Sequence, residues 1–281
     1  MHRIHDTFKH LRREHRKALI PFVMGGDPSL ALLGPILLAL EDAGADLIEV
    51  GIPFSDPLAD GPVIQGASAR ALARGATPIR VLDAVASVRR RLHVPVVALS
   101  YWNPIVQYAS PPRGRRGWRG GNGRADSARA FVRAAASCGV DGVIVPDLPV
   151  EEGRALRSVV DPTQFATIFL AAPTSPPDRL RMIARASEGF IYYVSVTGTT
   201  GVRRALPPML VHGVRQLKLL TTKPVCVGFG ISTPAQAAAV ARIADGVIVG
   251  SALVQAIERA QGRSGVVRAA ARLVQRLRNA V

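Results

Sequence analysis

Glu49 is a carboxylate inside a short apolar segment, between Ile48 and Val50, where the neighbouring residues predict a buried strand. Burial of an ionised carboxylate without a partner carries a large free-energy cost. The position therefore predicts either a structural ion pair with a nearby arginine or a chemical role. A carboxyl group desolvated in this way has a raised pKa, so it can give and take a proton near neutral pH.

Other carboxylates also lie where strands are expected to end. Asp56 and Asp60 belong to the SDPLAD segment that directly follows the Glu49 strand, and Asp147 ends a later apolar run. We expect Asp60 to be more solvated than Glu49 and to stay ionised, so that it can accept a hydrogen bond from an N–H group. For Asp56, an Asx turn at the adjacent proline explains the residue as well as a function does.

Two other kinds of catalysis find no support in the sequence. Lys223 precedes an apolar run instead of following one, so no lysine stands at a strand end to form a Schiff base. Most of the histidines crowd the N-terminus, and none shows the spacing of metal ligands. The sequence therefore predicts acid–base chemistry by carboxylates and no metal.

Apolar runs rich in β-forming residues alternate with segments of helical periodicity along the whole chain. Such alternation is typical of a parallel sheet covered by helices, and eight strands predict closure into a single (β/α)8 TIM barrel domain over residues 1–281. An open doubly wound sheet is the alternative, but no GxGxxG turn follows the first strand. The expected strands are 18–24, 46–52, 94–101, 142–148, 165–171, 190–196, 224–230 and 246–252, and the helical segments include 30–43, 66–92, 128–137, 177–187 and 234–243.

In such a barrel the chemistry lies where the strands end. Glycines at the ends of the last strands allow close approach of the backbone to a phosphate, although tight turns would also use them. The candidates for this phosphate site are Gly230, Ile231, Gly250 and Ser251, with Gly201 closing over them. A hydrophobic wall is expected from Phe22, Leu99, Tyr101, Leu170 and Phe229. We therefore predict acid–base chemistry on a phosphate ester with an apolar, aromatic body.

The composition agrees with a globular chain. Of 281 residues, 48% are hydrophobic, and the formal net charge is +16. The excess of basic over acidic residues is almost entirely arginine. These arginines are scattered along the chain with few aromatic residues between them, so we expect no nucleic-acid partner. Cys138 and Cys226 lie in apolar segments as small hydrophobic residues. No run is long enough to span a membrane, so we expect a cytoplasmic protein.

The segment GADLIEVGIPFSDPLADGPVIQGAS closely resembles the signature of the tryptophan synthase α subunit family. The resemblance continues in order through PFVMGGDP, SYWNPI, GVDGVIVPDLPVEE, FIYYVSVTGTTG, VGFGIS and VIVGSA, and so covers almost the whole chain. It implies a carbon–carbon lyase of tryptophan biosynthesis. This lyase cleaves indole-3-glycerol phosphate to indole and glyceraldehyde 3-phosphate by a retro-aldol reaction.

The resemblance also implies roles for particular residues. Glu49 would move a proton between the glycerol hydroxyl and indole C3, and Asp60 would stabilise the positive charge at the indole N–H. Tyr192 is expected close to Glu49, and Thr200 and Gly201 fall on a mobile loop that closes over the site. The indole ring would be held by Phe22, Leu99 and Phe229. No cofactor is expected in this chain, because the protonated indole ring itself accepts the electrons. Indole would pass to a β subunit that carries pyridoxal phosphate, in an α2β2 heterotetramer.

The chain departs from the family pattern at residues 110–124, SPPRGRRGWRGGNGR, where the family has a much shorter link. This basic, glycine-rich composition predicts an exposed loop, which either alters the β-subunit interface or is a tolerated insertion. Three alternatives stay open. They are a stand-alone lyase that releases free indole, a non-catalytic barrel kept as a scaffold, and a basic nucleic-acid binder.

Overall fold

The computed structural model describes residues 3–108, 123–194, 206–228 and 230–281. Within them, parallel strands form one sheet in the order β5-β4-β3-β2-β1-β9-β8-β7-β6. The two ends of this order, β5 and β6, are consecutive in the chain and are separated only by Phe169. They are the two halves of the fifth expected strand, so the sheet closes on itself there. The bounds are β1 Ala18–Met24, β2 Ile48–Gly51, β3 Val96–Leu99, β4 Gly142–Ile144, β5 Ala166–Ile168, β6 Leu170–Ala171, β7 Ile191–Val194, β8 Val225–Gly228 and β9 Gly246–Val249.

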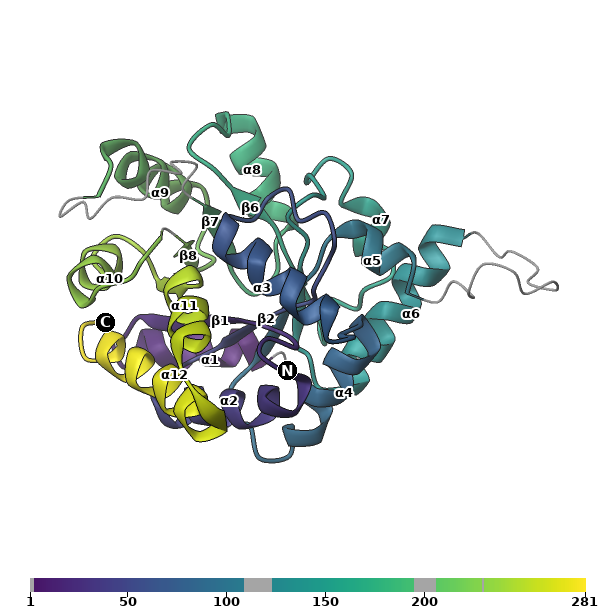
Figure 1. Cartoon of the computed structure of the whole chain (residues 1–281). Coiled ribbons are helices and arrows are strands. Elements are labelled where there is room, and N and C mark those ends of the chain that lie inside the picture. Colours follow the sequence, from purple (N-terminus) through teal and green to yellow (C-terminus); the bar gives the residue numbers. More distant parts are fainter. Residues whose placement is uncertain (1–2, 109–122, 195–205, 229) are drawn as a thin grey trace.

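Helices surround this sheet, as expected of a (β/α)8 barrel (Figure 1). α12 packs beside α2 and α11, so the last helix of the chain lies against the second. The helices are α1 Arg3–Arg13, α2 Leu30–Asp42, α3 Pro62–Ala73, α4 Pro78–Val88, α5 Trp102–Val106, α6 Gly123–Ser137, α7 Arg154–Arg157, α8 Pro177–Ala186, α9 Pro208–Leu220, α10 Pro234–Ala241, α11 Ser251–Arg259 and α12 Gly262–Arg278. The TIM barrel predicted from the sequence is confirmed.

One expected helical segment, 66–92, is wrong as a single element because it forms two helices. Gly75 ends the first with φ at +76°, a left-handed conformation that glycine adopts without strain. Thr77 then caps α4 by accepting a hydrogen bond from the N–H of Arg80, and Pro78 occupies the first helical position. Gly75, which ends the first helix, and Thr77, which begins the second, are only two residues apart. The apolar periodicity therefore continues across them, and the two helices are predicted as one.

Side chains that alternate along the strands fill the barrel interior. Leu47 belongs to the interior cluster, and side chains two residues apart on a strand share a face, so Glu49 also points inward. Glu49 is aligned with Phe22 on β1 and with Val97 on β3. The interior cluster comprises Ala18, Ile20, Leu47, Val97, Ile144, Ala166, Ile168, Phe190, Cys226 and Ile248, with Leu99, Leu170 and Tyr192 packed against it.

Helix α1 closes the barrel at the amino ends of the strands. Its apolar face, formed by Ile4, Phe8 and Leu11, joins the interior cluster, and the Phe8 ring lies 5.8 Å from that of Phe190. With this end filled, the open end lies at the carboxyl ends of the strands.

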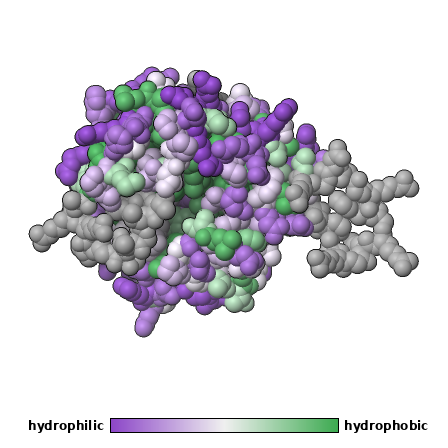
Figure 2. Space-filling model, turned by 90° about the horizontal axis from the view of Figure 1, so that it is seen from above, coloured by the Kyte–Doolittle hydropathy of each residue, from purple (hydrophilic) through white to green (hydrophobic). Residues whose placement is uncertain are grey.

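The outer surface is mainly hydrophilic. Seen from above, hydrophobic residues appear as separate patches and along a central furrow (Figure 2). Among the described helices, none combines the length and the apolar character needed to cross a bilayer.

Candidate active site

Glu49 is the buried carboxylate of the barrel mouth. Only 1% of the residue is exposed, and its Oε1 atom has no hydrogen-bond partner among the described residues. The ion pairs of the described residues do not include Glu49, so the structural pairing considered from the sequence finds no support there. Burial, with a further contribution from the charge of Asp60, raises the pKa of Glu49 to about 8. Near neutral pH the group is therefore mainly a protonated acid.

Asp60 lies in the loop between β2 and α3, one residue before Gly61, the N-cap of α3. Its N–H donates to the carbonyl of Pro57 at 3.0 Å, and its own carbonyl accepts from Nε2 of Gln65 at 2.9 Å. Burial raises the pKa of Asp60 to about 6, while a hydrogen bond with Tyr101 opposes the rise. Asp60 is partly buried, and so it is more exposed to solvent than Glu49, as the sequence predicts. With a pKa of about 6, the carboxylate still predominates at pH 7.

Tyr101 holds the Asp60 loop in place. Its hydroxyl group accepts a hydrogen bond from the N–H of Ala59 at 3.0 Å and also bonds the Asp60 carboxylate. Its ring lies 5.3 Å from the ring of Phe54. Burial and the charge of Asp60 raise the pKa of Tyr101, so the phenol remains a donor at all physiological pH values. Tyr101 was expected as part of the hydrophobic wall, and the structure adds this contact with the acidic loop.

Tyr192, on β7, lies within electrostatic reach of both carboxylates. Burial raises its pKa most, followed by the charges of Glu49 and Asp60. A methyl group on Gly228 of the neighbouring strand would lie 2.6 Å from the Tyr192 hydroxyl, so this glycine makes room for the phenol. The expected proximity of Tyr192 and Glu49 is thus present in the structure.

The expected hydrophobic wall is partly described. Phe22 is 4% exposed and packs against Gly51, where an added Cβ would lie 2.7 Å from the ring. Leu99 and Leu170 are partly buried at the edge of the interior cluster. Phe229, Thr200 and Gly201 lie outside the described residues.

The glycine-rich strand ends lie on the same side of the barrel. Gly250 is the N-cap of α11 and Ser251 is the first residue of that helix. A Cβ on Gly250 would lie 3.8 Å from Phe22, which places this turn beside the hydrophobic wall. Gly230 is exposed with φ at +39° and open space around it, while the side chain of Ile231 is buried. Backbone amides at a helix start are suited to bind a phosphate.

Comparison with known proteins adds decisive observations. The family model described as tryptophan synthase alpha chain matches residues 8–281. The tryptophan synthase alpha chain of Geotalea daltonii is 44% identical over 263 residues, covering 94% of this chain and 93% of the relative, and that of Gloeobacter violaceus is 48% identical over 259 residues, covering 92% and 87%. The structure of tryptophan synthase subunit alpha from Legionella pneumophila superposes with a TM-score of 0.86 at 36% identity, covering 100% of this chain and 98% of that one. A structure of tryptophan synthase from Mycobacterium tuberculosis gives a TM-score of 0.84 at 33% identity, covering 100% and 99%.

This chain belongs to the tryptophan synthase alpha chain family. Its reaction is the cleavage of indole-3-glycerol phosphate to indole and glyceraldehyde 3-phosphate, a carbon–carbon lyase step of tryptophan biosynthesis. The resemblance inferred from the sequence motifs is confirmed, and the comparisons favour none of the three alternatives, the stand-alone lyase, the scaffold and the nucleic-acid binder.

Two carboxylates considered from the sequence have local partners in this tryptophan synthase alpha chain. Asp56 is exposed and accepts a hydrogen bond from the hydroxyl of Ser55 at 2.5 Å. Asp147 is also exposed and accepts from the N–H of Trp102 at 2.8 Å, at the start of α5. Among the described residues, no group of three or more potential ligands could hold a metal ion.

Sequence reasoning missed two residues of α3 that hold the loops around the site. The buried Ser68 hydroxyl accepts from the N–H of Phe54 and donates to its carbonyl, both at 2.8 Å. Arg70 forms two hydrogen bonds with the buried Asp27, at 3.0 and 2.7 Å, and a third with Glu258 of α11 at 2.7 Å. These contacts join segments that are distant in the sequence, so the sequence does not predict them. The only signal in the sequence is that Ser68 and Arg70 are polar residues within a helix that is otherwise mainly apolar.

Proposed function

We propose that Glu49 is the general acid and base of the cleavage reaction and that Asp60 is the anion that stabilises the indole N–H as it becomes positively charged. The observation that carries this proposal is the pair itself. One carboxyl group is fully buried with a pKa of about 8, and the second, with a pKa of about 6, lies close enough to influence it. Two carboxyl groups with separated pKa values can act as an acid and as an anion at the same pH.

The proton transfers balance with these two residues alone. Protonated Glu49 gives its proton to indole C3, which leaves a positive charge shared with the ring nitrogen. Glu49, now a carboxylate, takes the proton from the hydroxyl on the carbon bonded to C3. The C–C bond breaks, its electrons return to the indole ring, and the oxygen becomes the aldehyde of glyceraldehyde 3-phosphate. Glu49 ends protonated, ready for the next cycle.

Tyr192 and Tyr101 support this pair in the proposal. Tyr192 faces both carboxylates, and Tyr101 bonds Asp60 directly, so each limits the positions that the carboxylates adopt. Phe22, Leu99 and Leu170, with Phe229, would hold the indole ring. The phosphate would bind at Gly230, Ile231, Gly250 and Ser251, because Gly250 and Ser251 begin α11 beside Phe22. Thr200 and Gly201 would close over the substrate.

The partner in this proposal is a tryptophan synthase β subunit, in an α2β2 complex that receives the indole. Pyridoxal phosphate would belong to that subunit, and the α chain would need no cofactor, since the indole ring accepts the electrons of the cleaved bond. One barrel domain would account for the chain, with an insertion at 110–124, most of which lies outside the described residues. We place the protein in the cytoplasm.

We propose that the insertion alters the β-subunit interface, either by contacting an acidic patch on the β subunit or by weakening docking. A pull-down with the β subunit, comparing the full chain with a chain that lacks residues 110–124, tests this idea. A changed affinity would support it, and an unchanged affinity would show a tolerated insertion.

The experiment that tests the proposed function measures indole release from indole-3-glycerol phosphate by the purified chain, alone and with a β subunit. We expect a slow basal rate that rises sharply when the β subunit is added. A fast rate indifferent to the β subunit would instead indicate the stand-alone lyase. Absence of turnover in both mixtures would contradict the proposed activity.

A further inference from the structure

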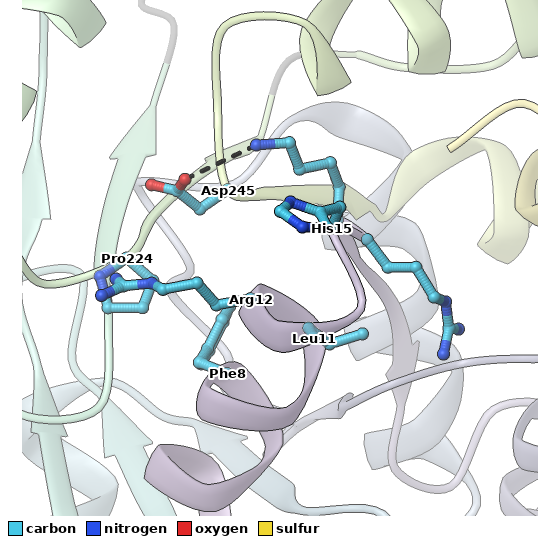
Figure 3. Close-up of a pocket in the computed structure, with 8 residues that line it drawn as sticks. Phe8, Leu11, Arg12, His15, Pro224 and Asp245 are labelled. Atoms are coloured by element: carbon cyan, nitrogen blue, oxygen red, sulfur yellow. Dashed lines mark ion pairs between the residues drawn. The ribbon is translucent and has the colours of Figure 1, made fainter.

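A second pocket lies at the opposite end of the barrel from Glu49. It opens between the last turn of α1 and the residues that precede β1, β8 and β9, and its volume is about 180 Å³ (Figure 3). Phe8, Leu11 and Arg12 approach it from α1, and Pro224 and Asp245 from the other side. The remaining lining residues are His15, Arg16 and Lys17.

The floor of this pocket is apolar. Phe8 and Leu11 are buried, and Pro224 is partly buried. Phe8 and Leu11 also belong to the interior cluster that fills the barrel. The floor of the pocket therefore packs against other buried side chains on its inner side. A flat apolar group of a ligand would find a firm surface there.

The rim carries more positive than negative charge. Asp245 is engaged by two cations, Lys218 at 2.8 Å and Lys17 at 3.8 Å. Arg16 reaches Glu14 and Asp46, and Asp46 is also held by Arg278 at 2.6 Å. Each carboxylate at this rim is therefore already paired with a cation.

Arg12 differs from Arg16 and Lys17, the other arginine and the lysine that line the pocket, in the partner of its side chain. Its Nη2 atom donates to the carbonyl of Thr222 at 3.0 Å, and within the described part of the chain no carboxylate pairs with it. A guanidinium group has five N–H donors in a fixed plane, so most of those on Arg12 remain open to an anion at the pocket mouth.

His15 occupies an unusual backbone position at the same rim. Helix α1 ends in a Schellman motif, in which the N–H of Arg16 donates to the carbonyl of Leu11 and the N–H of His15 to that of Arg12. His15 takes the left-handed position of this motif, with φ at 55°, which is strained for a residue other than glycine. The chain thus carries an imidazole at the pocket where glycine would be the conformationally easy choice.

We propose that this pocket binds a small organic anion, an aromatic carboxylate, with the ring on Phe8 and Leu11 and the carboxylate on Arg12, in a pocket that His15 also lines. The apolar floor selects for a ring, and the unpaired guanidinium selects for a planar anion, which it can bind through two parallel hydrogen bonds. The site is separate from the proposed active site, because it lies at the amino ends of the strands.

Benzoate is the probe, with neutral benzamide and inorganic phosphate as comparisons. Methyl NMR of the full chain follows Leu11, in the pocket, and Leu99, at the barrel mouth, in the same titration. We expect saturable shifts of the Leu11 methyl groups with a Kd of about 1 mM and no matching shift of Leu99. Benzamide and inorganic phosphate are each expected to bind at least about fivefold more weakly than benzoate, because one lacks the charge and the other lacks the ring.

Variants locate the contact. Arg12→Gln should weaken benzoate binding at least about fivefold. Arg13→Gln removes an exposed charge from the same turn without touching the pocket and should leave binding unchanged. His15→Gly, which suits the left-handed backbone, should also weaken binding while the chain stays folded.

Several results would overturn the proposal. They are no saturable shift of Leu11, a shift confined to Leu99, equal weakening by Arg12→Gln and Arg13→Gln, or benzamide binding as tight as that of benzoate. Phosphate binding as tight as that of benzoate would mean a site for simple anions and would overturn the aromatic class.

Discussion

Glu49 and Asp60 lie close enough in the barrel mouth for the charge of Asp60 to add to the rise in the pKa of Glu49. The two residues come from consecutive parts of the chain, one on β2 and one in the loop that follows it. Burial is the larger cause of the shift, so most of it is built into the barrel. The remainder depends on Asp60 being ionised.

Asp60→Asn should lower the pKa of Glu49, because the variant removes a negative charge that opposes its ionisation. A carboxyl ¹³C NMR titration of both proteins measures this directly. In the wild-type chain we expect Glu49 to titrate near pH 8, and in the variant at a lower pH that is still above 4.5. An identical titration in both proteins would mean that the two groups do not interact.

The rate of indole formation should depend on pH with a maximum near pH 7. As the pH falls through about 6, Asp60 gains a proton and loses the charge that stabilises the indole N–H. As the pH rises through about 8, Glu49 loses the proton that it must give to C3. Since the two groups interact, the two limbs report the apparent values of the pair. A kcat/KM profile that is flat between pH 5 and 9 would contradict the assignment.

Glu49→Gln should stabilise the fold, increasingly so as the pH rises. The folded state holds the Glu49 proton more tightly than the unfolded state, so the free energy of unfolding falls as the pH rises from about 4.5 to about 8. Glutamine does not ionise and avoids this loss. At pH 7 the variant should gain about 3 kcal/mol, because pH 7 lies about 2.5 units above the pKa of the unfolded state and each unit is worth about 1.4 kcal/mol. Urea unfolding of both proteins at pH 5 and pH 8 measures the difference, and a gain that does not grow with pH would argue against a buried, titrating Glu49.

Gly228→Ala should reduce turnover through Tyr192. The added methyl group would lie 2.6 Å from the Tyr192 hydroxyl and 2.9 Å from its Cε1 atom, so the phenol must leave its present position near the carboxylates. We expect kcat to fall about tenfold or more, in line with the effect of small misplacements in active sites. Gly265→Ala, on α12 with open space around it, is the matched control. Equal rates in the two variants would show that the position of Tyr192 does not matter.

The sequence predicts the barrel and its central residue because both depend on local patterns. Apolar runs of strand length mark the strands, and the single charge at position 49 stands out against such a run. Alternate side chains of a strand point to the same face, so Glu49 faces the barrel interior together with Leu47. Glu49 is aligned there with Phe22 of β1.

The environment of Asp60 depends on contacts between distant segments, which local patterns do not contain. Tyr101 reaches the loop from the end of β3, and Ser68 binds Phe54 from within α3. The loop held in this way leaves Asp60 partly buried, and burial raises the pKa of Asp60 to about 6. The link from Arg70 to Asp27 and Glu258 likewise spans three segments that only the closed barrel brings together.

The most direct test of the account is the turnover of Glu49→Gln with indole-3-glycerol phosphate, measured in the presence of the β subunit together with substrate binding by the same variant. Glutamine keeps the shape of the side chain but cannot give or take the proton. We expect indole formation to fall by a factor of about 10² to 10⁴, with substrate binding and the fold retained. Indole formation at the wild-type rate by this variant would remove Glu49 from the mechanism.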